Sequence, residues 1–187
     1  MAALIAAAKA ADYPAEIALV IANRPDAGGL AHAQAEGIRT AVVDHKIYGK
    51  DREAFERALQ AELEAHRIEL ICLAGFMRLL SPWFVERWHG RMLNIHPALL
   101  PAFKGLDTHR RALEAGAKTH GATVHLVAPD VDSGPIVIQE AVPVTESDTV
   151  ETLAARVLEV EHRIYPQALR LLALGRVQPR NGSISKK

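Results

Sequence analysis

Apolar residues recur along the chain in two alternating patterns, short continuous runs and longer runs with a period near 3.6 residues. The short runs, such as IELICLAG at 68–75, are typical of strands buried on both faces. The longer runs are typical of amphipathic helices, and the clearest places these apolar residues on one face: Ala54, Phe55, Ala58, Leu59 and Leu63. Strands are predicted at 16–23, 40–44, 68–75, 91–95, 121–129 and 134–144, and helices at 28–37, 51–66, 81–88, 108–116 and 149–175.

This alternation predicts an α/β fold with an open, mostly parallel, Rossmann-like sheet and helices on both faces. The last two predicted strands are joined by the turn-rich segment APDVDSG, which favours an antiparallel pair. We expect one domain over 1–177 and a disordered tail over 178–187. The chain opens on a helical pattern at Met1, although such domains usually lead with a strand. We therefore expect the first strand of the fold to be absent here, and the natural chain to start upstream of Met1.

Composition narrows the classes of partner. Lys plus Arg equals Asp plus Glu at 22 each, so there is no basic stripe of the kind that binds nucleic acid. A single Cys, Cys72, excludes an internal disulfide. No apolar run approaches the roughly 20 residues that span a membrane, and no signal peptide is recognised, so we expect a cytoplasmic protein. The histidines show no metal-ligand spacing, so we expect no metal; a monomer and a homodimer are both compatible with the sequence.

Two polar side chains share one face at the end of the predicted strand 91–95. In RMLNIHPALLP, Asn94 and His96 stand two positions apart, so both point to the same side of the strand. Pro97 ends the strand because it has no N–H to donate. Open α/β sheets bind ligands at the carboxyl ends of parallel strands. The pattern leaves two interpretations open, a functional pair or a polar pair satisfied by backbone groups.

A second candidate lies in PDVDSGPI, where Asp130 and Asp132 precede a predicted strand. By themselves, two acids and a Gly in a turn usually indicate turn chemistry. Together, however, N-I-H-P-x-L-L-P and, about 35 residues later, D-x-x-x-G-P-I resemble the folate-dependent formyltransferase family, and within it the phosphoribosylglycinamide formyltransferases. The similarity extends from Met1 to about Val177 through LAGFMRLLSPWFV, RMLNIHPALLPAFKGLDTHRRALEAG, HGATVHLVAPDVDSGPIVIQ and EHRIYP.

The resemblance implies a reaction and a catalytic set. A formyl group would move from the co-substrate N10-formyltetrahydrofolate to the amine of glycinamide ribonucleotide, a step of purine biosynthesis. His96 would handle protons and help stabilise the oxyanion, and Asn94 would donate a hydrogen bond to the same oxygen. Asp132 would favour protonated His96 and help place a proton-carrying water.

The resemblance also implies where the substrates bind. Folate would contact Arg52, Met77, Arg78, Leu79, Leu80, Asn94, Ala128, Pro129, Asp130, Val131 and Asp132. Glu161 matches a residue that contacts the ribose of the nucleotide. From the pattern alone, Arg52 and Glu161 are equally well interpreted as solvated charges on helices. The sequence departs from the family pattern at the nucleotide site. In family members a Gly-rich loop after the first strand binds the phosphate of the nucleotide, and this chain lacks that loop.

Three other functions stay open. A formyltetrahydrofolate deformylase shares the Asn, His and Asp pattern and hands the formyl group to water, but those enzymes carry an additional N-terminal regulatory domain. A fragment of a methionyl-tRNA formyltransferase would need a basic domain for tRNA, which the zero net charge argues against. The third is a folate-binding remnant without activity, suggested by the missing phosphate loop.

Overall fold

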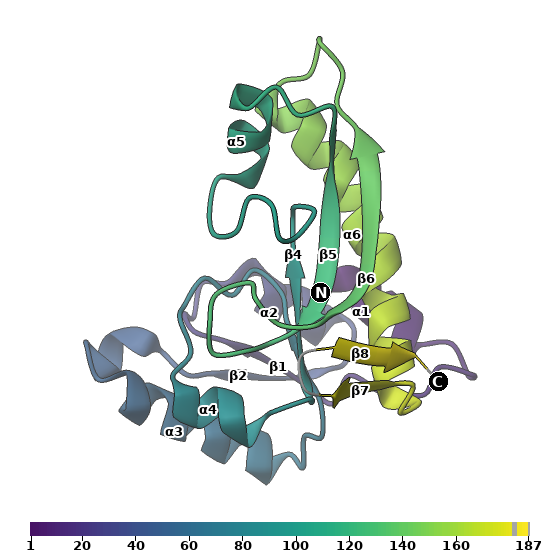
Figure 1. Ribbon diagram of the computed structural model, residues 1–187. Helices are drawn as coiled ribbons and strands as arrows, with labels where there is room; N and C mark the ends of the chain where they lie inside the picture. Colours follow the sequence, from purple (N-terminus) through teal and green to yellow (C-terminus); the bar gives the residue numbers. More distant parts are fainter. Residues whose placement is uncertain (181–182, 187) are drawn as a thin grey trace.

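The computed structural model describes residues 1–180 and 183–186 of the chain, and these form an α/β fold (Figure 1). In chain order the elements are α1 (Ala2–Ala8), β1 (Leu19–Ala22), α2 (Gly28–Ala35), β2 (Arg39–Val42), the 3-10 helix η1 (His45–Tyr48), α3 (Arg52–Ala65), β3 (Ile71–Leu73), α4 (Pro82–Arg87), β4 (Met92–His96), α5 (Thr108–Glu114), β5 (Thr119–Leu126), β6 (Ile136–Pro143), α6 (Val150–Ala173), β7 (Val177–Arg180) and β8 (Ser183–Lys186). Every strand and helix predicted from the apolar pattern is present, with ends displaced by a few residues.

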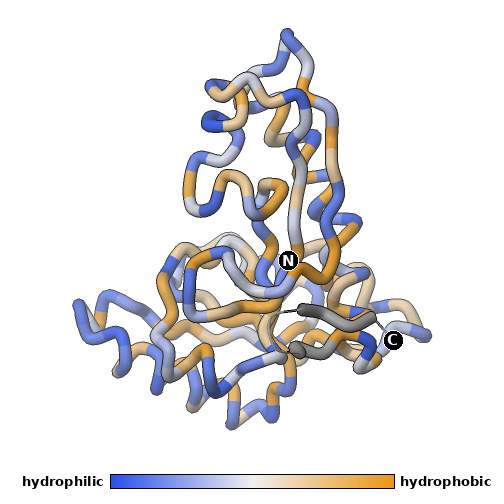
Figure 2. Tube along the Cα trace, viewed as in Figure 1, coloured by the Kyte–Doolittle hydropathy of each residue, from blue (hydrophilic) through white to orange (hydrophobic). Residues whose placement is uncertain are grey.

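Hydropathy follows this arrangement. Figure 2 shows hydrophilic residues gathered in the loop between β6 and α6 and along α3, at the margins of the molecule, and more apolar segments towards its middle. Two helices begin where the sequence predicts. Ser81 caps α4, with Pro82 as its first residue, and Thr149 forms a capping box with Thr152 at the start of α6.

The strands pair in a mixed pattern. β1 pairs with β2 and β3 with β4 in parallel, whereas β4–β5 and β5–β6 are antiparallel. The predicted parallel part and the predicted antiparallel pair of β5 and β6 are both found. β4 thus lies between a parallel neighbour and an antiparallel one, and its carboxyl end carries His96.

A cavity separates the two parallel pairs. Within residues 1–180 and 183–186, β1 is hydrogen-bonded only to β2 and β3 only to β4, so the two strands are not paired with each other. Both strands line a cavity of about 910 Å³, together with Met1, Leu4 and Leu169. All residues of β1 and β3 are only partly buried, although central parallel strands are normally covered on both faces. The cavity therefore exposes one edge of each of these two strands.

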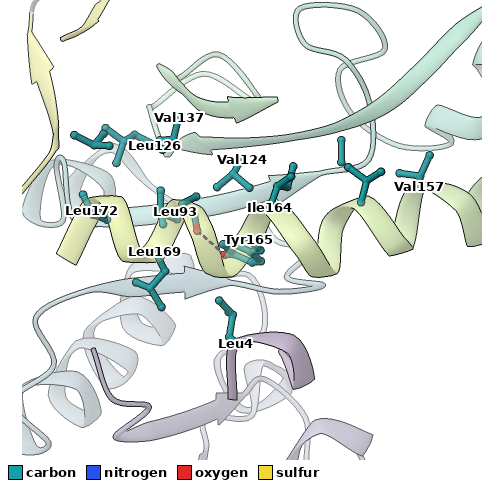
Figure 3. Packing of buried hydrophobic residues seen from close by; sticks show 14 of the residues in the cluster. Leu4, Leu93, Val124, Leu126, Val137, Val157, Ile164, Tyr165, Leu169 and Leu172 are labelled. Atoms are coloured by element: carbon teal, nitrogen blue, oxygen red, sulfur yellow. Dashed lines mark hydrogen bonds between the residues drawn. The ribbon is translucent and has the colours of Figure 1, made fainter. Parts of the chain in front are cut away.

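The main core lies between α6 and the strands β4, β5 and β6. Figure 3 shows Leu93 and Val124 facing α6, with Leu4 of α1 on the opposite side of that helix. The hydroxyl of Tyr165 on α6 donates to the carbonyl of Leu73 at 2.7 Å and also lies 3.2 Å from the carbonyl of Leu93. A single buried phenol therefore ties α6 to both β3 and β4.

The end of the chain differs from the sequence-based expectation. In place of the disorder predicted for 178–187, Val177–Arg180 pairs antiparallel with Ser183–Lys186; residues 181, 182 and 187 lie outside the described residues. Among the described residues, no helix is both long and apolar enough to cross a membrane.

Candidate active site

The side chains of β4 divide between core and site. Leu93 is fully buried in the core against α6, and Ile95 packs against the same cluster. Asn94 and His96 occupy the alternate positions and therefore lie on the other face of the strand. The prediction that these two residues point together from the end of β4 is confirmed.

The ring of His96 lies between two acceptors. Its Nε2 atom lies 3.0 Å from the carbonyl oxygen of Phe103, and its Nδ1 atom lies 3.3 Å from Oδ2 of Asp132. The neutral imidazole can donate to only one of them, whereas the protonated ring donates to both. With 6% of its side chain exposed, His96 makes these contacts largely shielded from water.

Asp132 completes the cluster from the turn between β5 and β6. Its φ of 48° lies in the left-handed region, which Asp tolerates better than most residues. Oδ2 accepts a hydrogen bond from the N–H of Gly105 at 2.9 Å. Burial alone would raise the pKa of Asp132, but the contacts with His125, Gly105 and His96 together hold that pKa below its usual value. The carboxylate form is therefore favoured in the site.

His125 is the residue that the sequence reasoning did not assign. It lies opposite Asn94 in the β4–β5 register and is 2% exposed. Its Nδ1 atom lies 2.9 Å from the carbonyl of Leu126, so in the neutral ring the proton belongs on Nδ1 and Nε2 is an acceptor. Nε2 lies 3.2 Å from Nδ2 of Asn94 and 3.6 Å from Oδ1 of Asp132. In the neutral ring it accepts from the Asn94 amide, whereas in the protonated ring its N–H faces the Asp132 carboxylate. His125 thus orients the amide of Asn94.

A buried network fixes the loop that follows His96. Thr123 on β5, fully buried, donates to the carbonyl of Ala98 at 2.6 Å and accepts from the N–H of Leu100 at 3.2 Å. Gln139 on β6 donates to the carbonyl of Leu100 and to the Thr123 hydroxyl. The loop therefore leaves β4 in a defined direction and brings the Phe103 carbonyl back to His96.

The residues assigned to folate lie on four segments: the start of α3, the loop before α4, the strand β4 and the turn between β5 and β6. Leu80 and Val127 pack on the same apolar cluster, which brings the loop before α4 close to the start of the Ala128–Asp132 turn. Met77 is 79% exposed, Leu79 58% and Val131 49%, an unusual exposure for large apolar side chains. Arg52 is the first residue of α3 and is exposed.

Glu161 lies apart from the His96 cluster in its contacts. Burial raises its pKa, and the charged amino group of Met1 nearby lowers it. Within the described residues, no group of three or more His, Cys, Asp or Glu side chains could hold a metal ion. The cavity between β1 and β3 is lined by Met77, Arg78 and Leu80 but not by His96 or Asp132, so it adjoins the site without containing it.

Residues 1–169 match the formyl transferase family. The chain belongs to this family. It is 54% identical over 176 residues to the trifunctional purine biosynthetic protein adenosine-3 of Gallus gallus. This match covers 94% of the chain but only 17% of that much longer protein. It is 42% identical to the phosphoribosylglycinamide formyltransferase of Escherichia coli, over 94% of the chain and 82% of the relative.

Solved structures agree with the family assignment. The glycinamide ribonucleotide transformylase 1 of Symbiobacterium toebii is 45% identical, with a TM-score of 0.94 over 98% of this chain and 86% of that one. A formyltetrahydrofolate deformylase from Pseudomonas syringae pv. tomato is 28% identical, with a TM-score of 0.83 over 91% of this chain and 56% of that one. This chain therefore has the same fold as a structure of each kind of enzyme.

Proposed function

We propose that this formyl transferase moves the formyl group of N10-formyltetrahydrofolate to the primary amine of glycinamide ribonucleotide. The observation that carries the proposal is the cluster at the end of β4, in which His96 lies between the Phe103 carbonyl and the Asp132 carboxylate, beside Asn94. The identities to relatives named for this reaction support the same substrates.

The chemistry needs no covalent enzyme intermediate. The amine nitrogen of the nucleotide attacks the formyl carbon, a C–N bond forms, and negative charge develops on the formyl oxygen. The bond from that carbon to the folate nitrogen then breaks, and the proton lost by the amine ends on that nitrogen. The amide of Asn94 would donate to the oxyanion, and a lost donor of this kind typically costs roughly 10²–10³ in rate. Protonated His96 would stabilise the oxyanion by its charge, and by its Nε2–H where the substrate replaces the Phe103 carbonyl as the acceptor.

Asp132 would act on His96 and on the proton path. A carboxylate 3.3 Å from Nδ1 favours the charged imidazolium that the oxyanion requires. It would also place the water that carries the proton from the amine to the folate nitrogen. The pterin ring would lie between the loop Met77–Leu80 and the turn Ala128–Asp132, where exposed apolar side chains and backbone groups are available. Arg52 would face the glutamyl tail, and Glu161 the ribose.

A single assay separates this function from its alternatives. The purified protein is given N10-formyltetrahydrofolate with and without glycinamide ribonucleotide, and release of tetrahydrofolate is followed. Release that requires the nucleotide and yields formylated nucleotide supports the transferase. If tetrahydrofolate is released at the same rate without the nucleotide, the protein is a deformylase. This is the second candidate function because the fold resembles that of a formyltetrahydrofolate deformylase. Folate binding in calorimetry with no release under either condition identifies an inactive folate-binding protein.

A further inference from the structure

A buried acid lies beneath the segment to which the proposed function assigns the pterin. Glu56 on α3 is 0% exposed. It accepts a hydrogen bond from the backbone N–H of Ser81 at 2.6 Å and another from the hydroxyl of Ser81. Among the described residues these are its only hydrogen-bond partners, and no cation pairs with it. A buried carboxylate is costly, so its retention at this position calls for an explanation.

Ser81 is the residue at which the loop 74–80 enters α4. Its hydroxyl accepts from the N–H of Phe84 at 3.3 Å while it donates to Glu56, so one serine caps α4 and is itself held from α3. Both the backbone and the side chain of Ser81 are thereby fixed by one acid. The position of α4's first turn relative to α3 follows from this contact.

The loop itself has few other restraints. In the described part of the chain, residues 74–80 make no side-chain hydrogen bond and no backbone–backbone hydrogen bond beyond the strand ladders. The guanidinium of Arg78 lies 5.4 Å from the ring centroid of Phe55, the neighbour of Glu56 on α3. Met77 and Leu79 point largely into solvent. Apart from the packing of Leu80 on its apolar cluster and of Arg78 on Phe55, the shape of the loop therefore depends on its two ends, β3 on one side and Ser81 on the other.

We propose that Glu56 is a positioning residue for folate, because it holds Ser81 and through it the loop whose backbone groups would meet the pterin. The inference rests on the proposed function. Glu56 does not touch the substrate in this arrangement. An apolar residue of similar size could fill the same buried space, whereas it would leave the two donors of Ser81 without an acceptor. The acid is therefore explained by placement of the loop and not by packing.

The test compares Glu56→Leu and Glu56→Gln with Glu53→Gln, a control on the same helix whose exposed carboxylate lies 3.6 Å from Arg57. Glu56→Leu should raise KM for N10-formyltetrahydrofolate by roughly tenfold, the loss typical of a charge-assisted hydrogen bond, and change KM for the nucleotide by less than about twofold. Glu56→Gln keeps a carbonyl that can accept from the Ser81 N–H, so it should restore most of the affinity. Glu53→Gln should match the wild type.

Two kinetic results would contradict the proposed role of Glu56. Unchanged KM for the folate in a folded Glu56→Leu protein overturns the proposal, as does an equal rise of both KM values with a fall in Tm. If the wild-type protein shows no transfer, the proposed function fails on its own, and amide hydrogen exchange of residues 76–81 then tests the anchoring. Faster exchange in Glu56→Leu than in wild type supports the positioning role, and equal exchange refutes it.

Discussion

The Nδ1 atom of His96 lies 3.3 Å from Oδ2 of Asp132, and the two residues come from the end of β4 and from the turn that follows β5. The antiparallel pairing sets the end of β5 beside the start of β4, with Leu126 opposite Leu93, and the turn that follows folds back so that Asp132 reaches His96 at the end of β4. This single contact joins the two sequence segments on which the proposed function depends.

Removal of the Asp132 charge should reduce catalysis without removing binding. Asp132→Asn keeps the size of the side chain but weakens its preference for protonated His96, so we expect kcat to fall by roughly 10²–10⁴ while KM for either substrate changes little. Steady-state kinetics measure this. Glu146→Gln is the matched control, because Glu146 is an exposed acid outside the site. Equal losses in the two variants would show that Asp132 matters only through the net charge of the protein.

His125 should matter although it is not expected to touch the substrate. His125→Leu removes the acceptor for the Asn94 amide and the imidazole beside Asp132, so we expect kcat to fall by roughly tenfold or more. Loss of the imidazole should also raise the pKa of Asp132 and move the acid limb of the pH profile of kcat upward. His89→Leu, at an exposed position, should leave both unchanged. An unshifted acid limb in His125→Leu would contradict the assigned contact.

The sequence predicted some of these features and could not predict others. The period of two along β4 places Asn94 and His96 on one face, and this is a local property of a strand. Asp132 looks like an ordinary turn acid until the family resemblance is considered, because its partner lies on another strand. Neither the local pattern nor the family resemblance assigned a role to His125 or Glu56. The role of His125 depends on the β4–β5 register. Glu56 is a charged residue on a helix face that the pattern assigns to solvent, although it is buried. Long-range pairing decides both.

The stability of the protein should fall between pH 6.5 and about pH 4. The pKa of His120 is lowered from 6.5 to about 4 because the ring is buried and because His109 lies next to it, with ring centroids 5.2 Å apart. Between these values the unfolded chain binds a proton that the folded protein does not, so the free energy of unfolding decreases as the pH falls. The destabilisation is absent above pH 6.5 and complete below about pH 4.

Thermal unfolding at several pH values tests whether protonation of His120 causes this loss of stability. We expect His120→Gln to reduce the loss of Tm between pH 7 and pH 5 by on the order of 5 °C. His89→Gln, which alters an exposed histidine, should retain the wild-type dependence. The same slope in all three proteins would assign the pH dependence to other groups.

Gly134 should be indispensable for the turn that carries Asp132. A Cβ at this position would lie 1.8 Å from the carbonyl oxygen of Leu126, a backbone atom that cannot move without breaking the strand. Gly134→Ala should therefore lower the free energy of unfolding by about 2–4 kcal/mol. Gly28→Ala at the start of α2 meets nothing within 4 Å and should be neutral or stabilising. Chemical denaturation compares the two, and equal stability would mean that the turn relaxes around the added methyl group.

A strand placed between β1 and β3 should stabilise the protein. In the described part of the chain each of these strands has one unpaired edge on the cavity of about 910 Å³, and apolar side chains from α1, α3 and α6 line that cavity. Such a slot favours a short, wholly apolar strand parallel to β1. A right-handed crossover through α1 would connect that strand to β1, and α1 begins directly after Met1.

The experiment joins two N-terminal extensions of equal length to Met1, one an apolar strand followed by a Gly-containing loop and the other a Gly/Ser sequence. The apolar extension should raise Tm by several degrees, because each kilocalorie per mole corresponds to about 2–4 °C in a chain of this size, and should slow amide exchange in β1 and β3. The Gly/Ser extension buries nothing and should leave both unchanged. Identical Tm and exchange for the two extensions would show that the edges of β1 and β3 do not accept a further strand.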